Sequence, residues 1–356
     1  MRATDVRLRL PQRFNLVSAI LWGLRIVVVV LVLAGAWATL SSGKLSPDTW
    51  RDLVVFGIAQ GSVYALIALG YTLVYGVLFM INFAHGDVFM TGAMTAFFVA
   101  RNFDESGFLN ANPIVALLIL FAVSMLTSMV VAIALERIAY RPLRRAPRLV
   151  PLITAIGASL FISNSVRGIY GEQDQAYPTI NALQGRFDIF GIPILKTQAV
   201  VIVAAVVFMV GLVYFVERTR TGRAMRAVSE DKDVAALMGI NVDRIIVTTF
   251  AIGGALAGAA GILYALVFNE VDWFMGFLPG IKAFTAAVLG GIGNIAGAML
   301  GGLTLGVLES VGPFLLLGGA GVPSPNQLRD VIAFTVLVLV LIFRPNGILG
   351  QSEPGS

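Results

Sequence analysis

The chain contains no cysteine and only one histidine among its 356 residues. Without thiols there are no disulfides, thiolate catalysts or cysteine-based metal sites, and one histidine cannot build a histidine-rich metal centre. Charged residues are also scarce, at 13% of the chain against roughly a quarter in soluble domains. Hydrophobic residues make up 58%. These proportions indicate a chain that resides in a lipid bilayer.

Long apolar segments recur from residue 17 to residue 343, and a bilayer-spanning helix needs about 20 such residues. Hydrocarbon offers backbone groups no partner, so a spanning segment must be a helix or part of a closed barrel. The apolar runs lack the alternation of barrel strands. The sequence therefore predicts an all-α fold, a polytopic transmembrane helical bundle. The predicted spans are 17–40, 53–79, 88–100, 113–135, 149–169, 198–216 and 245–268, and segment 280–343 returns the chain to the inner side.

The basic residues are concentrated in alternate loops. Of 25 Lys and Arg residues, 17 lie in segments 1–25, 137–148 and 218–244 or at Arg344. An excess of basic residues marks the cytoplasmic side of a membrane protein. The net charge of +5 is therefore explained by membrane topology, and a nucleic-acid partner is not supported.

The first apolar segment allows two interpretations. An Arg-rich start, an apolar core at 26–35 and the small residues around Trp37 are typical of a cleaved secretory signal. The basic region of 25 residues is long for a signal, however, and Arg25 can snorkel to the interface. An uncleaved anchor is the favoured interpretation, and either one places residue 45 outside.

Two apolar segments are interrupted by polar or glycine-rich stretches. The sequence MINFAHGD, residues 80–87, breaks the run from Leu53 to Ala100, and the 13 residues of 88–100 would span only about 20 Å as a helix. Near the other end, GGIGN at residues 290–294 interrupts a second run. We therefore predict broken or re-entrant helices.

Unwound backbone at membrane depth is tolerated where it lines a cavity, and transporters place substrate contacts there. The candidate pathway residues are Asn82, His85, Asp87 and Asn294. The alternatives are that Asn82 and Asp87 cap helix ends and that His85 is a core group with one hydrogen bond. Taken singly, each residue favours the structural interpretation.

Other motifs suggest packing rather than chemistry. Lys282 and Glu309 lie inside apolar stretches but near enough to expected segment ends to reach the interface, so a structural role is expected for both. Small-xxx-small spacings, such as Gly57 with Gly61, predict close helix packing. The GxGxxA match at 291–296 lacks the strand and helix context of a dinucleotide site. No phosphate loop and no nucleophile with a nearby base occur, so the chain does not look like an enzyme.

The second half of the inner segment 217–244 has the signals of one helix of about nine residues. Ser229 is expected to cap it, acidic residues favour its first turn, and Gly239 offers a left-handed stop. Val234, Leu237 and Met238 form an apolar stripe on a helix too short to be stable alone. It should pack on its own membrane domain, on the lipid surface or in a partner's groove.

From about residue 56 to residue 350 the sequence resembles the membrane permeases of branched-chain amino-acid ABC importers, the LivH/LivM type, and LivH more closely. The similarity rests on five stretches: GSVYALIALGYTLVYG at 61–76, MINFAHG at 80–86, ERIAYRP at 136–142, AFTAAVLGGIG at 283–293 and PNGILG at 345–350. The resemblance implies that segment 217–244 contacts an ATPase through its coupling residues Glu230, Ala235, Ala236, Leu237, Gly239 and Ile240.

The resemblance also implies a bacterial inner-membrane assembly. Its partners would be a second permease subunit, two cytoplasmic ATP-binding subunits and a periplasmic substrate-binding protein, with no cofactor on this chain. The expected domains are an N-terminal segment 1–52, a permease domain 53–350 and a tail 351–356. The expected function is uptake of branched-chain or related small amino acids. Urea or short amides are alternative substrates, and a stand-alone secondary transporter or channel and a purely structural subunit are competing functions.

Overall fold

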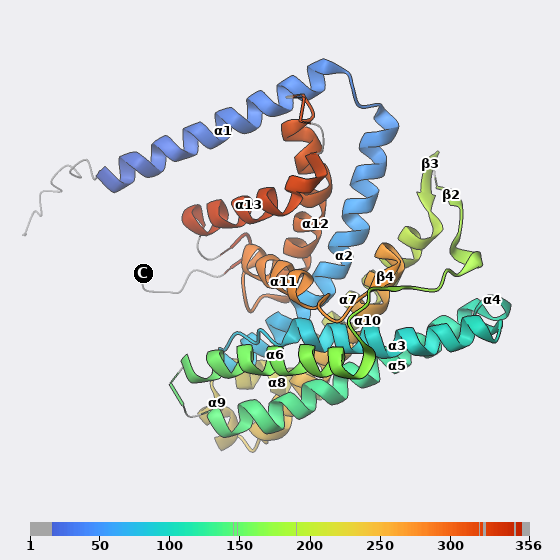
Figure 1. The fold of residues 1–356 in the computed structure, drawn as a ribbon. Helices are drawn as coiled ribbons and strands as arrows, with labels where there is room; N and C mark the ends of the chain where they lie inside the picture. The colour runs from blue at the N-terminus through green and yellow to red at the C-terminus, as the bar shows by residue number, and fades with distance from the viewer. Residues whose placement is uncertain are drawn as a thin grey trace, which may run out of the picture.

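The central element is helix α2 (Pro47–Leu78), which is 32 residues long and buried along most of its length (Figure 1). The computed structural model describes residues 16–350 except 145, 148, 190, 320, 323–324 and 345–346. The predicted N-terminal basic stretch 1–15 and the tail 351–356 lie outside the described residues. Ser46 begins α2 by accepting a hydrogen bond from the Thr49 N–H at 3.2 Å.

Some of the other long helices contact α2 directly, and the rest pack against those helices. The long helices besides α2 are α1 (Leu16–Ser42), α3 (His85–Glu105), α5 (Pro113–Leu135), α6 (Leu149–Tyr170), α7 (Lys196–Arg218), α10 (Val242–Phe268), α11 (Phe277–Gly290), α12 (Ile295–Leu317) and α13 (Arg329–Phe343). Shorter helices are α4 (Phe108–Ala111), α8 (Arg220–Glu230) and α9 (Lys232–Leu237). A π-helical turn η1 (Glu136–Tyr140) and three 3-10 turns, η2 (Arg141–Leu143), η3 (Asn181–Leu183) and η4 (Pro325–Leu328), complete the helical elements. The predicted all-α polytopic bundle is confirmed.

Glycines allow the central helices to approach closely. A Cβ on Gly306 of α12 would overlap the backbone of Gly61, and one on Gly61 would lie 2.9 Å from the Gly302 carbonyl oxygen. On the other side of α2, Gly258 of α10 packs against α5, where the Ser124 hydroxyl donates to the Gly258 carbonyl at 2.7 Å. These contacts confirm the packing role predicted for the small-residue spacings.

The predicted spans agree with the observed helices except at two places. The predicted half-crossing 88–100 is wrong, because α3 extends from His85 to Glu105, 21 residues or about 31 Å. Segment 280–343 forms three helices, of which α11 and α13 have 14 and 15 residues. Within the described residues, eight helical segments are long and apolar enough to cross a membrane. The chain is therefore a multi-pass membrane protein.

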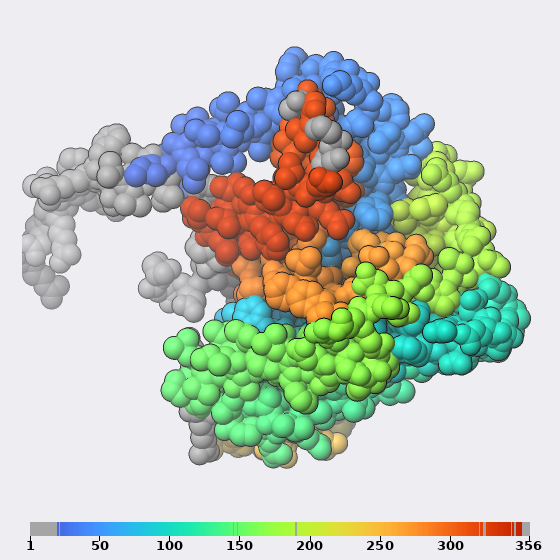
Figure 2. Space-filling model, viewed as in Figure 1, coloured from blue at the N-terminus to red at the C-terminus, as the bar shows by residue number. Residues whose placement is uncertain are grey.

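Helices α1 and α13 lie at one edge of the bundle, and Figure 2 shows both with their side chains on the surface. The C-terminal part of α1 contacts α12: a Cβ on Gly35 would lie 2.6 Å from the Leu316 carbonyl oxygen. The Thr39 hydroxyl also accepts a hydrogen bond from the Gly319 N–H at 2.7 Å. This packing is compatible with an uncleaved anchor, which stays a prediction.

Two small antiparallel pairs lie in the loops that the charge pattern places outside. Strand β1 (Gln175–Ala176) pairs with β4 (Glu270–Val271), and β2 (Arg186–Ile189) forms a hairpin with β3 (Ile192–Leu195). In the hairpin, Arg186 is opposite Leu195. All four strands are short.

Candidate functional site

The MINFAHGD stretch forms an irregular connection into α3. Phe79 ends α2 in a left-handed conformation with φ +56°, and its N–H donates to the Tyr75 carbonyl. The chain then continues without helical structure until His85. Asn82, His85 and Asp87 are all buried, with exposed fractions of 3%, 2% and 4%. Their burial places all three inside the protein and away from the lipid-facing surface.

Each polar side chain of this connection is near another helix. The Tyr140 hydroxyl in η1 donates to Asn82 Oδ1 at 2.7 Å, and the Ser163 hydroxyl in α6 donates to Asp87 Oδ1 at 2.7 Å. The His85 ring lies edge-on to Tyr71 of α2, with ring centroids 4.8 Å apart. The start of α3 is thereby linked to α2, α6 and the end of α5.

The capping interpretation of these residues is wrong. The residue before α3 is Ala84, and no side chain caps the helix. Asn82 and Asp87 use their side chains for contacts with other elements. His85 agrees with the expectation of a buried core group: its ring hydrogen-bonds with the backbone of Ile67, and its Nε2 has no hydrogen-bond partner among the described residues. It packs against α2 where Gly70 leaves room for the ring.

Asn294 lies apart from the other three candidates. It caps α12, accepting a hydrogen bond from the Gly297 N–H at 3.0 Å, and its amide donates to the Leu349 carbonyl at 2.9 Å. Gly291 and Gly293, with φ +110° and +91°, form the turn before it. Asn294 thus joins the start of α12 to the C-terminal segment, and the structure does not bring it to Asn82.

A narrow cavity nevertheless lies between the two broken segments. It is lined by Asn82 and Ile81 from the first, Ile292 from the second, and Tyr71 and Phe284 among others. Its volume of about 10 Å³ is roughly that of one water molecule. The two irregular segments therefore approach each other, with no room for an amino acid in this conformation.

Lys282 and Glu309 form a second buried polar cluster, and the expectation that they reach the interface is wrong. Lys282 and Glu309 do not reach the interface: they are 4% and 1% exposed, and Lys282 Nζ lies 3.2 Å from Glu309 Oε1. Gln60 Nε2 and the Tyr64 hydroxyl of α2 donate to Glu309 Oε2 at 2.6 and 3.0 Å. The expectation failed because α11 is short and α13 covers Lys282, whose Nζ is 2.6 Å from Asp330 Oδ1.

Such a cluster is costly inside a membrane. A charged side chain at the bilayer centre costs about 3 kcal/mol on insertion scales unless it is paired or hydrated. Here Lys282 pairs with both Glu309 and Asp330, and the neutral donors of α2 hydrogen-bond to Glu309 Oε2. The network joins α2, α11, α12 and α13, so it holds the second half of the chain onto the central helix.

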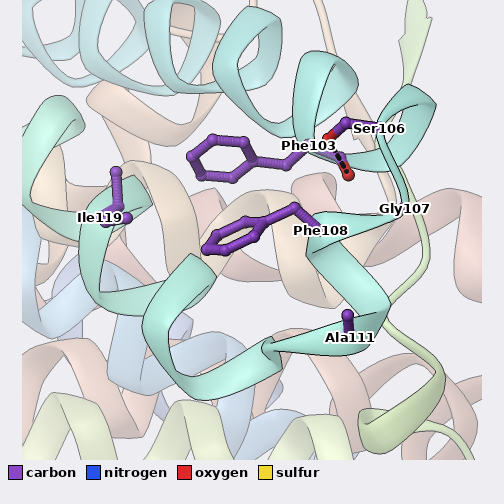
Figure 3. Close-up of a pocket in the computed structure, with 6 residues that line it drawn as sticks. All are labelled: Phe103, Ser106, Gly107, Phe108, Ala111 and Ile119. Atoms are coloured by element: carbon purple, nitrogen blue, oxygen red, sulfur yellow. Dashed lines mark hydrogen bonds between the residues drawn. The ribbon is translucent and has the colours of Figure 1, made fainter.

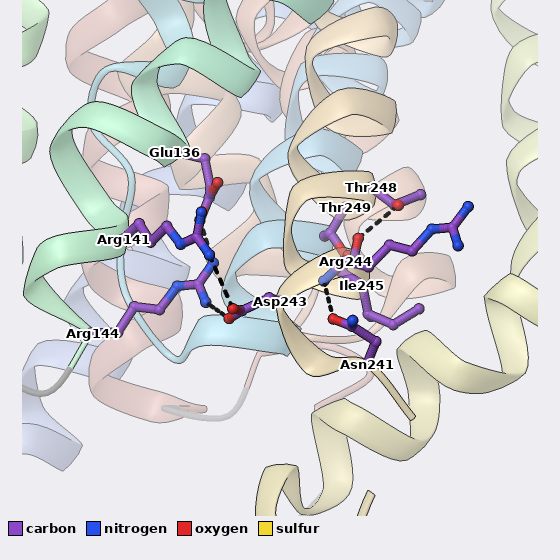
Figure 4. Close-up of polar contacts among 9 residues, drawn as sticks. All are labelled: Glu136, Arg141, Arg144, Asn241, Asp243, Arg244, Ile245, Thr248 and Thr249. Carbon is purple, nitrogen blue, oxygen red and sulfur yellow. Dashed lines mark hydrogen bonds and ion pairs between the residues drawn. The ribbon is translucent and has the colours of Figure 1, made fainter. Parts of the chain in front are cut away.

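Near α8 and α9, the side chains of Glu136, Arg141, Arg144 and Asp243 form a cluster of ion pairs, which we call the Arg144 clasp (Figure 4). Arg144 contacts both Glu136 at the end of α5 and Asp243 at the start of α10. Arg141 adds a bond to Asp243 at 3.2 Å. Glu136 is fully buried, whereas Asp243 is exposed. The clasp ties η1, which carries the Tyr140 bond to Asn82, to the first turn of α10.

The expected coupling segment forms two helices rather than one. Asp231 caps α9 by accepting hydrogen bonds from the N–H groups of Asp233 and Val234. The predicted Ser229 cap is therefore wrong: Ser229 lies in α8 and donates to the Arg226 carbonyl. Glu230 is the last residue of α8. Gly239 has φ +82°, as expected for a left-handed stop.

The apolar stripe of this segment remains uncovered. Leu237 and Met238 are 87% and 78% exposed, and Val234 is also exposed. Ala236 and Gly239 are exposed as well, whereas Ala235 is buried and Ile240 packs partly against the core. Packing of the stripe on the chain's own membrane domain is excluded for these exposed side chains. The stripe faces away from the bundle.

Beside this segment, Lys232 Nζ lies 5.8 Å from the centre of the Phe79 ring at the end of α2. Partial burial, together with the nearby Arg144, lowers the pKa of Lys232. Segment 217–244 therefore contacts Phe79, the residue just before the MINFAHGD connection. At the opposite end of α3, an open depression is lined by Phe103, Ser106, Gly107, Phe108, Ala111 and Ile119 (Figure 3). It offers no charged group for a polar substrate.

Comparison with known proteins identifies close relatives. The family described as "Branched-chain amino acid transport system / permease component" matches residues 53–341. The chain is 46% identical to the high-affinity branched-chain amino acid transport system permease protein BraD of Pseudomonas aeruginosa, over 86% of this chain and 98% of BraD. It is 42% identical to LivH of Escherichia coli, over 83% and 94% of the two chains. Among solved structures, PsaBC from Streptococcus pneumoniae in complex with Fab gives a TM-score of 0.42 at 13% identity, covering 86% of this chain and 96% of that one.

Proposed function

This chain belongs to the branched-chain amino acid transport permease family, and from that membership we propose that it imports branched-chain amino acids as one permease subunit of an ATP-driven transporter. The high-affinity relatives BraD and LivH align along almost their whole length. The observation that carries the proposal is the exposed apolar stripe of α9. It gives a membrane chain a docking point for another protein.

The α9 stripe fits the role of a coupling helix. Leu237 and Met238 project from a helix of six residues whose Ala235 is anchored in the bundle. A helix this short is stable only when it is packed, so a partner's groove is the natural place for the stripe. We assign Glu230, Ala235, Ala236, Leu237, Gly239 and Ile240 to the contact with the ATP-binding subunit.

The route from α9 to the pathway candidates is continuous. Lys232 reaches Phe79, and the MINFAHGD connection begins at the next residue. The clasp of Arg144 then joins η1 to α10, and Tyr140 of η1 binds Asn82. A displacement of α8 and α9 by ATP binding would be transmitted to Asn82, His85 and Asp87. Asn294 would respond through the turn at Gly293, which borders a small cavity with Arg226 of α8.

The proposed assembly follows from the same membership. We propose that residues 53–350 form the permease domain of a bacterial inner-membrane complex. Its other members are a second permease, two cytoplasmic ATP-binding subunits and a periplasmic substrate-binding protein. ATP hydrolysis belongs to the partner chains in this proposal, and this chain provides one half of the translocation path.

Co-purification of the tagged chain in mild detergent from its host tests the assembly. We expect an ATP-binding protein and a second permease to be identified with it by mass spectrometry. A pure homo-oligomer without an ATP-binding chain would contradict the proposal and favour a stand-alone transporter. Competition of leucine uptake by urea or acetamide tests the alternative substrates, and neither compound is expected to compete.

Substitution in the coupling helix tests its assignment. Leu237→Asp places a charge in the proposed groove, so we expect the chain to stay in the membrane while ATP-driven uptake falls at least tenfold. Leu237→Met keeps the apolar contact and serves as the matched control, with nearly normal uptake expected. Uptake by Leu237→Asp equal to that of the control would remove α9 from the coupling path. Gly239→Pro is expected to uncouple in the same way, because it alters the left-handed stop.

A further inference from the structure

A cavity lies at the outer end of α2, between that helix, the β2–β3 hairpin and the start of α7. Its volume is about 310 Å³, at the lower end of the roughly 300–1,000 Å³ typical of small-molecule sites. Helix α2 contacts both β3 and α7, and Figure 1 shows the hairpin beside the upper part of α2. The charge pattern places this end of α2 and the hairpin outside. The cavity is therefore on the side from which an imported solute arrives.

One wall of the cavity is a single face of α2. It consists of Thr49, Asp52, Leu53 and Phe56. Their spacing of three and four residues places these side chains on the same side of a helix. The Phe56 ring packs edge-on against Phe268 of α10, with ring centroids 6.3 Å apart, which holds it in place. This wall therefore presents one carboxylate beside an apolar surface.

The other wall is one face of the hairpin. Arg186 of β2 is opposite Leu195 of β3, and Pro193 comes two residues before Leu195. Directly opposed residues, and residues two apart on one strand, share a face of a sheet. Gln198, in the first turn of α7, completes the lining. This wall presents one guanidinium and one amide beside a second apolar surface.

The two charges of the cavity face each other without a hydrogen bond. Arg186 Nη2 is 3.9 Å from Asp52 Oδ2, which is beyond hydrogen-bond distance and the longest ion pair in the described part of the chain. The two side chains are 55% and 48% exposed. An ion pair this long and this exposed contributes little to stability. Both charges can therefore take another partner at small cost.

These groups suit an aliphatic amino acid in its zwitterionic form. A guanidinium binds a carboxylate, a carboxylate binds an ammonium group, and apolar walls accept an aliphatic side chain. A solute with only one charge would leave one of the two protein charges unmatched. Because both charges are half-exposed, binding is weak, which suits a transport site that its ligand must leave again.

We propose that this cavity is an outer receiving site for zwitterionic aliphatic amino acids. Arg186 binds the carboxylate of the amino acid, and Asp52 binds its ammonium group. Leu53, Phe56 and Leu195 contact the aliphatic side chain. This inference rests on the proposed function and adds to it the residues that the substrate meets first on the outer side.

Cysteine labelling tests the site, because the natural chain has no cysteine. In the co-purified complex, freed of binding protein, we expect Leu195→Cys to react with N-ethylmaleimide. Millimolar leucine should slow this reaction at least threefold, whereas isovalerate, which lacks the ammonium group, and isoamylamine, which lacks the carboxylate, should not. The matched control is Ile192→Cys, a 37% exposed position on the opposite face of the same strand. It should react equally fast with and without leucine.

Charge removal provides the second measurement. Arg186→Gln or Asp52→Asn, each combined with Leu195→Cys, should abolish the protection by leucine, measured as the ratio of labelling rates with and without it. Asp48→Asn is the control, because Asp48 is also in the first turns of α2 but pairs with Arg51 outside the cavity. It should keep the threefold protection.

Protection of Leu195→Cys that each cavity charge variant abolishes would support the site. The site would be overturned by an unlabelled Leu195→Cys, by equal labelling with and without leucine, or by protection that survives either cavity charge variant. Equal protection of Ile192→Cys, or loss of protection with Asp48→Asn, would also overturn it. In each of these cases the proposed function stands if the unaltered complex imports leucine. Absence of leucine import by that complex would instead refute the proposed function.

Discussion

At the scale of single residues, the polar side chains inside this membrane protein act in pairs that join different helices. Asn82 accepts from Tyr140, Asp87 accepts from Ser163, and Glu309 accepts from Gln60 and pairs with Lys282. Each bond connects positions far apart in the sequence. A buried polar group without a partner is costly, so these pairs fix how the helices are placed relative to one another.

The Tyr140–Asn82 bond provides a direct test of that argument. Tyr140→Phe removes the donor and leaves the buried Asn82 amide oxygen unpaired, which costs about 1–3 kcal/mol. We expect a lower midpoint of thermal unfolding for the purified protein and reduced uptake, since η1 would lose its link to the start of α3. Tyr214→Phe, at a 66% exposed position in α7, is the control. An unchanged midpoint for Tyr140→Phe would show that the bond does not stabilise the fold.

The Lys282 network predicts non-additive substitutions. Lys282→Met alone leaves the buried Glu309 carboxylate without its cation, a change that costs about 3–5 kcal/mol for buried pairs. The double variant Lys282→Met with Glu309→Gln removes both charges, and Asp330 keeps Arg329 as its partner. Thermal unfolding should therefore show the double variant to be more stable than Lys282→Met. Additive losses would mean that the two charges do not interact.

The sequence identified these residues more easily than their partners. Asn82, His85 and Asp87 stand out because polar residues are rare in an apolar run, and the structure buries all three. Their contacts could not be predicted, because Tyr140 and Ser163 are distant in the sequence. The prediction that Lys282 and Glu309 reach the interface is wrong for a related reason: their burial depends on distant parts of the chain. Their depth depends on the short α11 and on α13 folding back over Lys282, which hydropathy does not reveal.

At the scale of elements, the contact between α2 and α12 is the main structural joint. Both helices carry glycines at four-residue spacing, and the backbones of Gly61 and Gly306 are in direct contact. Such a joint has no space for even one additional methyl group at its centre. The glycines of this contact allow α12 to pack closely against α2, which α10 also contacts.

A methyl group at this joint is expected to separate the helices. Gly306→Ala would force its Cβ into the Gly61 backbone, so we expect less folded protein in detergent extracts. Fluorescence-detected size-exclusion chromatography measures this loss. Gly76→Ala, in α2, meets nothing within 4 Å and should be neutral or slightly stabilising because alanine favours helices. Equal recovery of both variants would contradict the packing argument.

Element boundaries followed from the sequence wherever an apolar run ended in polar residues. The predicted span 113–135 coincides with α5, and 149–169 differs from α6 by one residue. Prediction failed where a helix contains polar residues, as in α3, which begins within MINFAHGD and ends at Glu105. It also failed in segment 217–244, where Asp231 rather than Ser229 caps the last short helix.

At the scale of the whole molecule, two separate clusters of ion pairs join the helices of the bundle. The Arg144 clasp joins α5 to α10 at the end that carries α8 and α9, and the Lys282 network joins α2, α11, α12 and α13. Helices α9 and α13 lie at different levels of the molecule, α9 at the bottom of the view and α13 above it (Figure 1). A partner acting at α9 would move the framework that supports the pathway.

The most direct test of the whole account is ATP-dependent uptake of radiolabelled leucine by proteoliposomes containing the co-purified complex and its loaded binding protein. We predict accumulation that requires ATP, is abolished by Leu237→Asp, and is retained with Leu237→Met. Uptake that is independent of ATP, or no leucine uptake by a fully assembled complex, would contradict the assignment of this chain as a permease subunit of a branched-chain amino-acid importer.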